Sequence, residues 1–168
     1  MWNHAAPLLF VDENTVAVND GLVFFMSMLT AYALDAHTGD VVWTSNLGDS
    51  ENPPLAAANG VVYIAGFHTV YALDDRTGNV LWTYTPGGNP AYASTIAANG
   101  VLYVATQSDV YALNASTGDL LWGNADNADA FGTSPLVVNG VLYVATASEG
   151  RIYSYHLPQL SSIRLRRP

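Results

Sequence analysis

The chain has 168 residues and a net charge of −9, half of its residues are hydrophobic, and it contains neither cysteine nor lysine. This size and composition fit one domain with a sizeable core, and they exclude a disulfide framework, a thiolate metal site and a cysteine nucleophile. All fourteen acidic residues lie at or before Glu149, and an acidic body repels phosphate backbones, which argues against nucleic-acid binding.

The N-terminal end, residues 1–7, has no basic region followed by an apolar run. No stretch of eighteen uninterrupted apolar residues occurs in the sequence, as a membrane-spanning helix would require. We therefore predict no direct membrane insertion, and we recognise no signal peptide in this sequence.

The first long motif runs from Tyr32 to Trp43 and reads Tyr-Ala-Leu-Asp-Ala-His-Thr-Gly-Asp-Val-Val-Trp. It returns at residues 71–82 and again at residues 111–122. A repeat with a fixed period near forty residues is typical of propellers, solenoids and other arrays.

A second marker recurs in phase with the first. Asn19-Asp20-Gly21 and the Asn-Gly pairs at 59–60, 99–100 and 139–140 each precede a short alternating strand. Asn-Gly is a strong hairpin signal, because both central residues of a type I′ turn need positive φ. Each repeat therefore contains two hairpins.

One repeat thus reads as four strands: residues 94–98, residues 101–106, residues 110–114 and residues 119–122. Four strands in forty residues, joined by turns too short for a helix, predict an all-β fold with the four-stranded antiparallel blades of a β-propeller. We expect about four blades, in a partial or small propeller. The predicted domain spans residues 1–158, with blades at approximately 8–46, 47–86, 87–126 and 127–158, and a basic tail follows at 159–168.

The tryptophans, which recur about every forty residues, continue this repeat at the N-terminal end of the sequence but not at the C-terminal end. Trp2 lies 41 residues before Trp43, whereas Ser162 stands near the position where the period expects a further tryptophan. Either residues 1–5 supply the last strand of the fourth blade and close a ring, or the sequence is an excerpt from a longer array.

The three copies of Ala-x-Asp-x-x-Thr-Gly-x-x-x-Trp resemble the tryptophan-docking motif of the pyrroloquinoline quinone (PQQ) repeat propellers. The resemblance covers most of residues 8–156. That family includes quinoprotein alcohol dehydrogenases, the scaffold lipoprotein of the outer-membrane β-barrel assembly machinery, and sensor domains of bacterial kinases. It implies an extracytoplasmic location in the periplasm or cell envelope.

A quinoprotein dehydrogenase would bring PQQ, a Ca²⁺ ion held by Glu, Asn and Asp, and an aspartate base. The alcohol dehydrogenases of this family also carry an adjacent pair of cysteines, and this sequence has no cysteine. No motif places the calcium ligands or the base at a numbered position. We therefore expect no cofactor, with PQQ and Ca²⁺ implied by the resemblance alone. The sequence favours a non-catalytic module, and the alternative is a fragment of a PQQ- and Ca²⁺-dependent alcohol or sugar dehydrogenase.

The repeated residues are interpreted as structural, because a residue that recurs in every blade serves the same purpose in each. The Asp or Asn caps a turn, the glycine adopts positive φ, and the tryptophan covers the neighbouring blade near a small alanine. The predicted docking set is Ala33, Asp35, Gly39, Trp43, Ala72, Asp74, Gly78, Trp82, Ala112, Asn114, Gly118, Trp122 and Trp2.

Function is expected in the loops that vary between repeats, at the end of the blades opposite the Asn-Gly and Thr-Gly turns. We call this end the loop face. Aromatic residues there suit contacts, acidic residues could bind Ca²⁺ without matching a known calcium loop, and the histidine is more simply a solvated one. The predicted ligand- or partner-binding residues are Tyr92, Phe131, Asp126, Asp129, His68 and Gln107.

The sequence therefore predicts a scaffold or ligand-binding platform that is not an enzyme. Its expected partner is another protein or further propeller blades. A homodimer that closes an eight-bladed ring through open blade edges is a third hypothesis.

Overall fold

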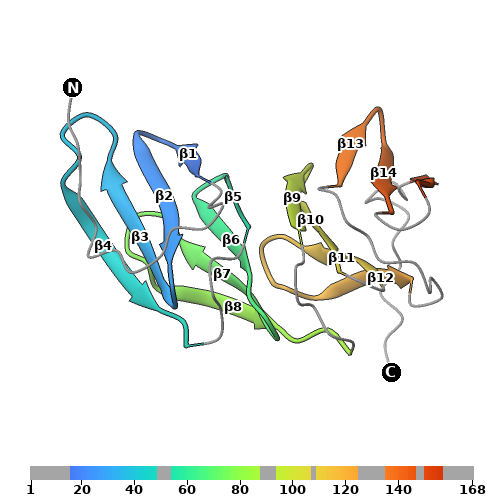
Figure 1. The fold of residues 1–168 in the computed structure, drawn as a ribbon, viewed down its shortest axis with the longest axis horizontal. Helices are drawn as coiled ribbons and strands as arrows, with labels where there is room; N and C mark the ends of the chain where they lie inside the picture. Colours follow the sequence, from blue (N-terminus) through green and yellow to red (C-terminus); the bar gives the residue numbers. More distant parts are fainter. Residues whose placement is uncertain are drawn as a thin grey trace.

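The computed structural model describes residues 16–48, 54–87, 94–106, 109–124, 135–146 and 150–156. Four antiparallel sheets follow one another along the chain, and their connections run only between adjacent strands (Figure 1). This is the all-β architecture of a partial propeller with about four blades. The described residues include no helix of the length and hydropathy needed to cross a membrane.

The first three sheets have four strands each, and the described part of the fourth has three. Blade 1 contains β1 (Ala17–Asn19), β2 (Leu22–Ser27), β3 (Thr30–Asp35) and β4 (Val41–Asn46). Blade 2 contains β5 (Leu55–Ala58), β6 (Val61–Ala65), β7 (Val70–Asp74) and β8 (Val80–Tyr84). Blade 3 contains β9 (Ser94–Ala98), β10 (Val101–Ala105), β11 (Val110–Asn114) and β12 (Leu120–Asn124), and blade 4 contains β13 (Leu136–Val138), β14 (Val141–Ala145) and β15 (Ile152–His156).

The hairpin turns between the first two strands of each blade have the predicted geometry. Asn59, Asn99 and Asn139 have φ of 54°, 53° and 51°, and each following glycine lies between 76° and 80°. In blade 1 the turn is made by Asp20 and Gly21, with φ of 47° and 79°. Two successive residues in the left-handed region are the requirement of a type I′ turn, which explains the Asn-Gly preference.

Two of the predicted strands of blade 3 have boundaries that differ from the structure by one or two residues. The second strand of blade 3 ends at Ala105, because Thr106 instead closes the next loop by donating its backbone N–H to Asp109 O at 2.8 Å. The last strand runs from Leu120 to Asn124, because the Asp119 carbonyl accepts a bond from Asn114 N and so belongs to the turn.

The core consists of three apolar layers, one between each pair of successive sheets. Side chains alternate between the two faces of a strand, so a blade contributes to two layers. In blade 2, Val62 and Ile64 pack against blade 1, whereas Tyr63 and Ala65 pack against blade 3. The first strands of successive blades lie next to one another, from β1 through β5 and β9 to β13.

Candidate functional site: the blade junctions and the loop face

The Asp or Asn at the start of each third turn organises that turn through its side chain. Asp35 Oδ1 accepts the backbone N–H groups of His37 and Thr38, both at 2.8 Å. Asp74 Oδ1 does the same for Arg76 and Thr77, at 3.1 and 2.8 Å. In blade 3 the amide oxygen of Asn114 takes this role, so the turn needs a side-chain acceptor and does not need a charge.

These hydrogen bonds favour the ionised form of both carboxyl groups. The backbone N–H of Thr38, followed by that of His37, lowers the pKa of Asp35 below 3.8. For Asp74 the largest cause of the lowered pKa is the Thr77 hydroxyl, which donates at 2.8 Å. Both are acceptors held in turns, an arrangement that suits structure and leaves neither carboxyl poised as a proton donor near neutral pH.

A bulge in the last strand pair of each complete blade sets the position of the tryptophan. The register shifts after Ala33, so that Ala33 faces Trp43 across the sheet while Leu34 faces Val41. The same shift follows Ala72 and Ala112. A bulge bends the strand and re-aims its side chains, and here it precedes a ring that reaches the next blade.

The Trp43 ring docks on the turn of blade 2. Its Nε1–H donates to Asp75 O at 2.8 Å, and its atoms lie over Gly78, where a β-carbon would stand 2.6 Å from the ring. Trp82 docks on blade 3 in the same way, donating to Ala115 O at 3.0 Å and lying over Gly118. The small residue beneath each ring is thus the turn glycine of the next blade, whereas the motif alanine faces the ring across its own sheet.

The last tryptophan of the described series has a different neighbour. Trp122 meets Tyr155 of β15, with ring centroids 5.1 Å apart. Tyr155 occupies the strand position that Leu73 and Leu113 hold in the preceding blades, because each pairs with the equivalent residue of the previous strand. The predicted docking residue Trp2 lies outside the described residues.

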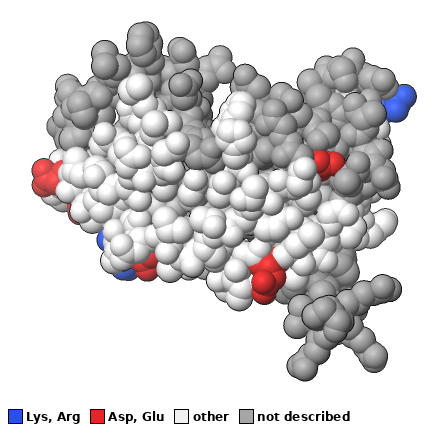
Figure 2. All heavy atoms as spheres, turned by 90° about the horizontal axis from the view of Figure 1, so that it is seen from below, with Lys and Arg blue, Asp and Glu red and all other residues white. Residues whose placement is uncertain are grey.

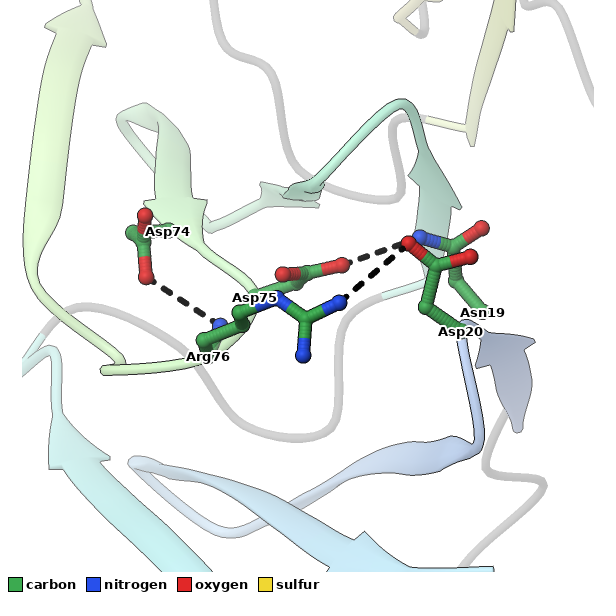
Figure 3. A network of polar contacts seen from close by, with 5 residues as sticks. All are labelled: Asn19, Asp20, Asp74, Asp75 and Arg76. Atoms are coloured by element: carbon green, nitrogen blue, oxygen red, sulfur yellow. Dashed lines mark hydrogen bonds and ion pairs between the residues drawn. The ribbon is translucent and has the colours of Figure 1, made fainter.

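A polar network joins the turns of blades 1 and 2 (Figure 3). Asn19 Nδ2 donates to Asp75 Oδ2 at 2.9 Å, and the Asp75 side chain is 1 % exposed. Arg76 and Asp20 form an exposed ion pair at 3.7 Å beside it. Sequence reasoning missed these residues because it compared the repeats for what they share, whereas the signal was a pair of polar residues where the next junction has Ala58 and Ala115.

Of the predicted loop-face residues, only His68 lies within the described part of the chain. It is exposed, and its ring meets the Phe67 ring edge-on at 4.7 Å. The structure therefore presents His68 as part of an aromatic loop tip. The other predicted contacts lie outside the described residues, namely Tyr92, Gln107, Asp126, Asp129 and Phe131.

Blades 1 and 2 present large apolar side chains on tight loops at this end. Met28, Leu29 and Phe67 are 45 %, 36 % and 45 % exposed. Met28 has φ of 51°, and every other described residue with positive φ is Asn, Asp or Gly. A methionine in the left-handed region costs roughly 1–2 kcal/mol, so its presence at an exposed tip favours a contact role over a folding role.

Hydrogen bonds tie the blade 1 loops together at this end. Leu47, which begins the connection to blade 2, donates its N–H to Leu29 O at 2.8 Å. The hydroxyl of Tyr71 in blade 2 donates to Leu47 O at 3.3 Å. The loop after β2 and the loop after β4 therefore share one face, as the strand order predicted.

The equivalent end of blade 3 contains a buried polar pair. Tyr111 donates its hydroxyl to Asp109 Oδ2 at 3.1 Å, and Asp109 is 6 % exposed. Burial, followed by the negative charge of Asp109, raises the pKa of Tyr111 to about 12. This pair braces the loop between β10 and β11 and keeps the phenol protonated at physiological pH.

The donor set offers no assembled metal centre. Among the described residues, no three His, Cys, Asp or Glu side chains gather closely enough to hold an ion. PQQ and Ca²⁺ therefore stay implications of the family resemblance. The face in Figure 2 shows scattered acidic and basic side chains among mostly uncharged ones, with no gathered basic patch in its described part.

Comparison with known proteins places the chain among repeat propellers. The family model described as "Outer membrane protein assembly factor BamB" matches residues 27–93 and 86–157. No curated protein is a significant match.

The structural neighbours share the fold at low identity. The crystal structure of BamB from Moraxella catarrhalis is 21 % identical with a TM-score of 0.75, and the match covers 90 % of this chain and 50 % of that one. The computationally designed Ika4 protein is 14 % identical with a TM-score of 0.68, and the match covers 94 % of this chain and 100 % of that one. Quinohemoprotein alcohol dehydrogenase ADHIIG from Pseudomonas putida HK5 is 17 % identical with a TM-score of 0.67, and the match covers 83 % of this chain and 29 % of that one. The chain thus spans half the length of the BamB structure.

Proposed function

Because the chain belongs to the family of PQQ-like repeats described as outer membrane protein assembly factor BamB, we propose that it is a non-catalytic scaffold whose loop face binds a protein partner. The observation that supports this most directly is the exposed apolar tip of each of the first two blades. Exposed methionine and aromatic side chains on loops held by a rigid sheet are typical of protein contacts.

The division of labour within each blade supports the same proposal. At the turn end, the Asp or Asn, the glycine and the docked tryptophan are occupied by contacts within the propeller. At the loop end, Met28, Leu29 and Phe67 contribute little to the core because a third or more of each remains exposed. Side chains that remain largely outside the core are those that can evolve to suit a partner.

A paired-variant binding experiment tests the proposal. Partners are captured from an envelope extract with the wild-type chain and identified, and their affinities are then measured for Met28→Ser/Phe67→Ser. Apolar anchors at an interface carry much of its affinity, so we expect a loss of about tenfold or more. A second variant, Tyr92→Ala/Phe131→Ala/Asp126→Ala, tests the loop-face residues predicted from the sequence.

The matched control is Val42→Ser/Leu81→Ser, which removes two side chains of similar exposure, 47 % and 51 %, from the outer strands β4 and β8. Binding should be unchanged in this control. Equal losses in the loop and control variants, or no loss in either loop variant, would overturn the loop face as the binding surface.

Met28→Asn separates contact from folding at a single position. Asparagine tolerates the left-handed conformation that Met28 adopts at φ 51°. We expect unchanged or slightly higher thermal stability together with weaker partner binding. Lower stability with unchanged binding would assign Met28 to folding instead.

The alternative is a fragment of a PQQ- and Ca²⁺-dependent dehydrogenase, motivated by the neighbour from Pseudomonas putida HK5, of which this chain covers 29 %. If the group were bound it would act as the redox centre for alcohol or sugar oxidation. Dye-linked oxidation of an alcohol or glucose that depends on added PQQ and Ca²⁺ would replace the scaffold proposal. The proposal predicts no such activity.

We also propose that the chain acts in the cell envelope, as the family description suggests. Fractionation of cells expressing the full-length gene product tests this, with the chain expected in the periplasmic or envelope fraction. Recovery with cytoplasmic markers would contradict it.

A further inference from the structure

Blades 1 to 3 each end in an outer strand, which in blade 2 is β8 (Figure 1). Among the described residues, β8 pairs with β7 alone, so one of its edges is open. The blades pack against one another through the faces of their sheets. A further blade before blade 1 or after blade 4 would cover a face of those blades and would leave the open edge of β8 as it is.

The register shows which backbone groups of β8 point to this edge. Asp74 of β7 donates its N–H to Asn79 O, which puts the even-numbered residues of β7 on the β8 side. Trp82 and Tyr84 are the register partners of even-numbered residues, so their backbone groups bond to β7. Thr83 lies between them, and its N–H and C=O therefore point to the open edge.

The side chains along this edge do not oppose a further strand. Natural sheets protect exposed edges with lysine, other charges, proline or bulges. The segment 80–85 reads Val-Leu-Trp-Thr-Tyr-Thr and has no charge and no proline. The bulge of this strand pair lies at Leu73, before the regular stretch from Trp82 to Tyr84. β-Branched and aromatic residues favour strand pairing, and Val80 and Leu81 are 48 % and 51 % exposed.

The equivalent edges of blades 1 and 3 are less suited to pairing. In β12 the position of Thr83 is held by Gly123, and glycine weakens a strand. In β4 the position of Thr85 is held by Asn46, a residue type that is depleted in strands. Among the outer strands that the structure describes, β8 is therefore the one with the strongest tendency to pair.

The charges near the start of β8 indicate which kind of segment fits. Asp74 caps the turn that leads into the strand, and Arg76 in this turn already pairs with Asp20. Asp40 and Asp119 precede the equivalent strands β4 and β12. An incoming strand with a basic residue at this end complements these charges, whereas a second copy of the chain brings the same net charge of −9.

We infer that the open edge of β8 binds an extended apolar segment of a partner protein, with a basic residue beside the Asp74 turn. The segment adds a fifth strand to blade 2 and runs antiparallel to β8, the more stable pairing, so its C-terminal end lies at this turn. A lipid surface does not fit, because acyl chains cannot pair the N–H and C=O of Thr83. The edge is separate from the loop face, and the inference does not depend on the proposed function.

Amide hydrogen exchange of the isotopically labelled chain tests the inference residue by residue. The probe is the peptide acetyl-Thr-Val-Thr-Val-Thr-Val-Arg-amide. In the free chain we expect fast exchange at Thr83 and slow exchange at Trp82 and Tyr84. Peptide at about 1 mM should slow exchange at Thr83 about tenfold, which corresponds to a dissociation constant of about 0.1 mM.

Two altered peptides separate backbone pairing from charge, and they need no variant of the protein. A peptide N-methylated at every residue keeps the side chains but has no N–H donors, so it should leave exchange at Thr83 unchanged. A peptide with Glu in place of Arg should bind about threefold more weakly at low ionic strength.

Leu81→Lys tests the edge from the side of the protein. A lysine on an edge strand opposes pairing, so the protection at Thr83 should fall below about twofold. Val42→Lys is the matched control, since Val42 holds the equivalent position in β4 and is 47 % exposed. The loop-face variant Met28→Ser/Phe67→Ser should leave the protection unchanged, which makes failure of the two proposals distinguishable. Circular dichroism melts establish that each variant is folded.

Several results would overturn the inference. Slow exchange at Thr83 in the dilute free chain would show that the chain covers its own edge. Protection that rises with chain concentration in the absence of peptide would assign the edge to a second copy. Equal protection by the unmodified and N-methylated peptides, or no protection by the unmodified one, would exclude strand addition at β8.

Discussion

The junction between blades 1 and 2 and the junction between blades 2 and 3 share a tryptophan, a glycine and a backbone carbonyl, yet they differ in everything polar around them. At the first junction, the Asp75 carbonyl accepts Trp43 Nε1–H, and Phe24 has no hydroxyl that could donate to it. The Asp75 side chain accepts a hydrogen bond from Asn19. At the second, the Ala115 carbonyl accepts both Trp82 Nε1–H and the hydroxyl of Tyr63, at 3.0 and 3.2 Å.

The comparison teaches that the repeat has a constant part and a variable part. The constant part fixes the spacing of neighbouring blades, because the ring must lie flat on a glycine. The variable part distinguishes one junction from another, because a buried carboxylate needs its own donor and would be costly opposite Ala58. We propose that the variable part helps to keep the blades in order, and the substitutions below separate the two contributions.

The largest loss of stability should follow from adding a β-carbon to the glycine beneath a docked tryptophan ring. Gly78→Ala introduces a β-carbon 2.6 Å from the Trp43 ring at φ of 71°, and Gly118→Ala does the same beneath Trp82 at 2.7 Å. Backbone strain and overpacking together should cost about 3 kcal/mol in either variant, measured by urea unfolding.

Gly60→Ala is the control for these variants, because φ there is 80° but nothing lies within 4 Å of the added carbon. It should cost only about 1–2 kcal/mol from backbone strain. Equal losses in Gly78→Ala and Gly60→Ala would mean that the ring yields and that the glycine does not set the blade spacing.

Breaking the variable part of the first junction should have the next largest effect. Asn19→Ala removes the donor from a carboxylate that is 1 % exposed and should cost about 2 kcal/mol. The double variant Asn19→Ala/Asp75→Ala recreates the Ala58 and Ala115 pairing and should cost about 1 kcal/mol or less.

A double-mutant cycle checks this, with an expected coupling of about 1–2 kcal/mol between Asn19 and Asp75. Asp20→Asn/Arg76→Ser is the comparison, since that exposed ion pair should contribute about 0–1 kcal/mol. Simple additivity of the Asn19 and Asp75 substitutions would refute the proposed pairing.

A smaller effect is expected at the second junction. Tyr63→Phe removes one hydrogen bond to Ala115 O while keeping a ring at the position where blade 1 has Phe24. The loss should be about 1 kcal/mol by urea unfolding, the typical net value of one hydrogen bond. A loss above about 2 kcal/mol would show that the hydroxyl positions the Trp82 ring as well as the carbonyl.

The predictability of these features from sequence follows the same division. The strands, the Asn-Gly turns and the Trp series could be read from the sequence because each depends on local chemistry repeated in phase. The residue beneath each tryptophan ring could not be read from the sequence. For Trp43, Gly78 and Ala72 of the next blade are both small, and the bulge after Ala33 decides which of them lies beneath the ring. Asp75 and Asn19 are 56 residues apart, and the sequence around either residue does not predict their contact.

The loop face was predictable as a location but not as a set of residues. Strand order alone puts the loops after β2 and β4 at one end, whereas exposure at a tip depends on the length and backbone geometry of each loop. Met28 illustrates this, because its φ of 51° follows from a two-residue connection that the sequence does not mark with Gly or Asn. Phe67 is 45 % exposed beside the predicted residue His68, and this exposure likewise depends on the geometry of its loop.

The smallest effect concerns the turn acids, and it compares blades 1 and 2 with blade 3. The pKa values of Asp35 and Asp74 are lowered in the folded chain, chiefly by the Thr38 N–H and the Thr77 hydroxyl, so the unfolded chain binds protons first as pH falls below about 4. Their contribution is therefore present above that pH and is lost below it, and it is small because both carboxyl groups are exposed. Asp35→Asn/Asp74→Asn copies Asn114 and should flatten the decline of the melting temperature below about pH 4 while leaving stability at pH 7 nearly unchanged. An unchanged acid decline would mean that other carboxylates dominate it, and Asp20→Asn, at an exposed site whose ion pair is weak, serves as the comparison.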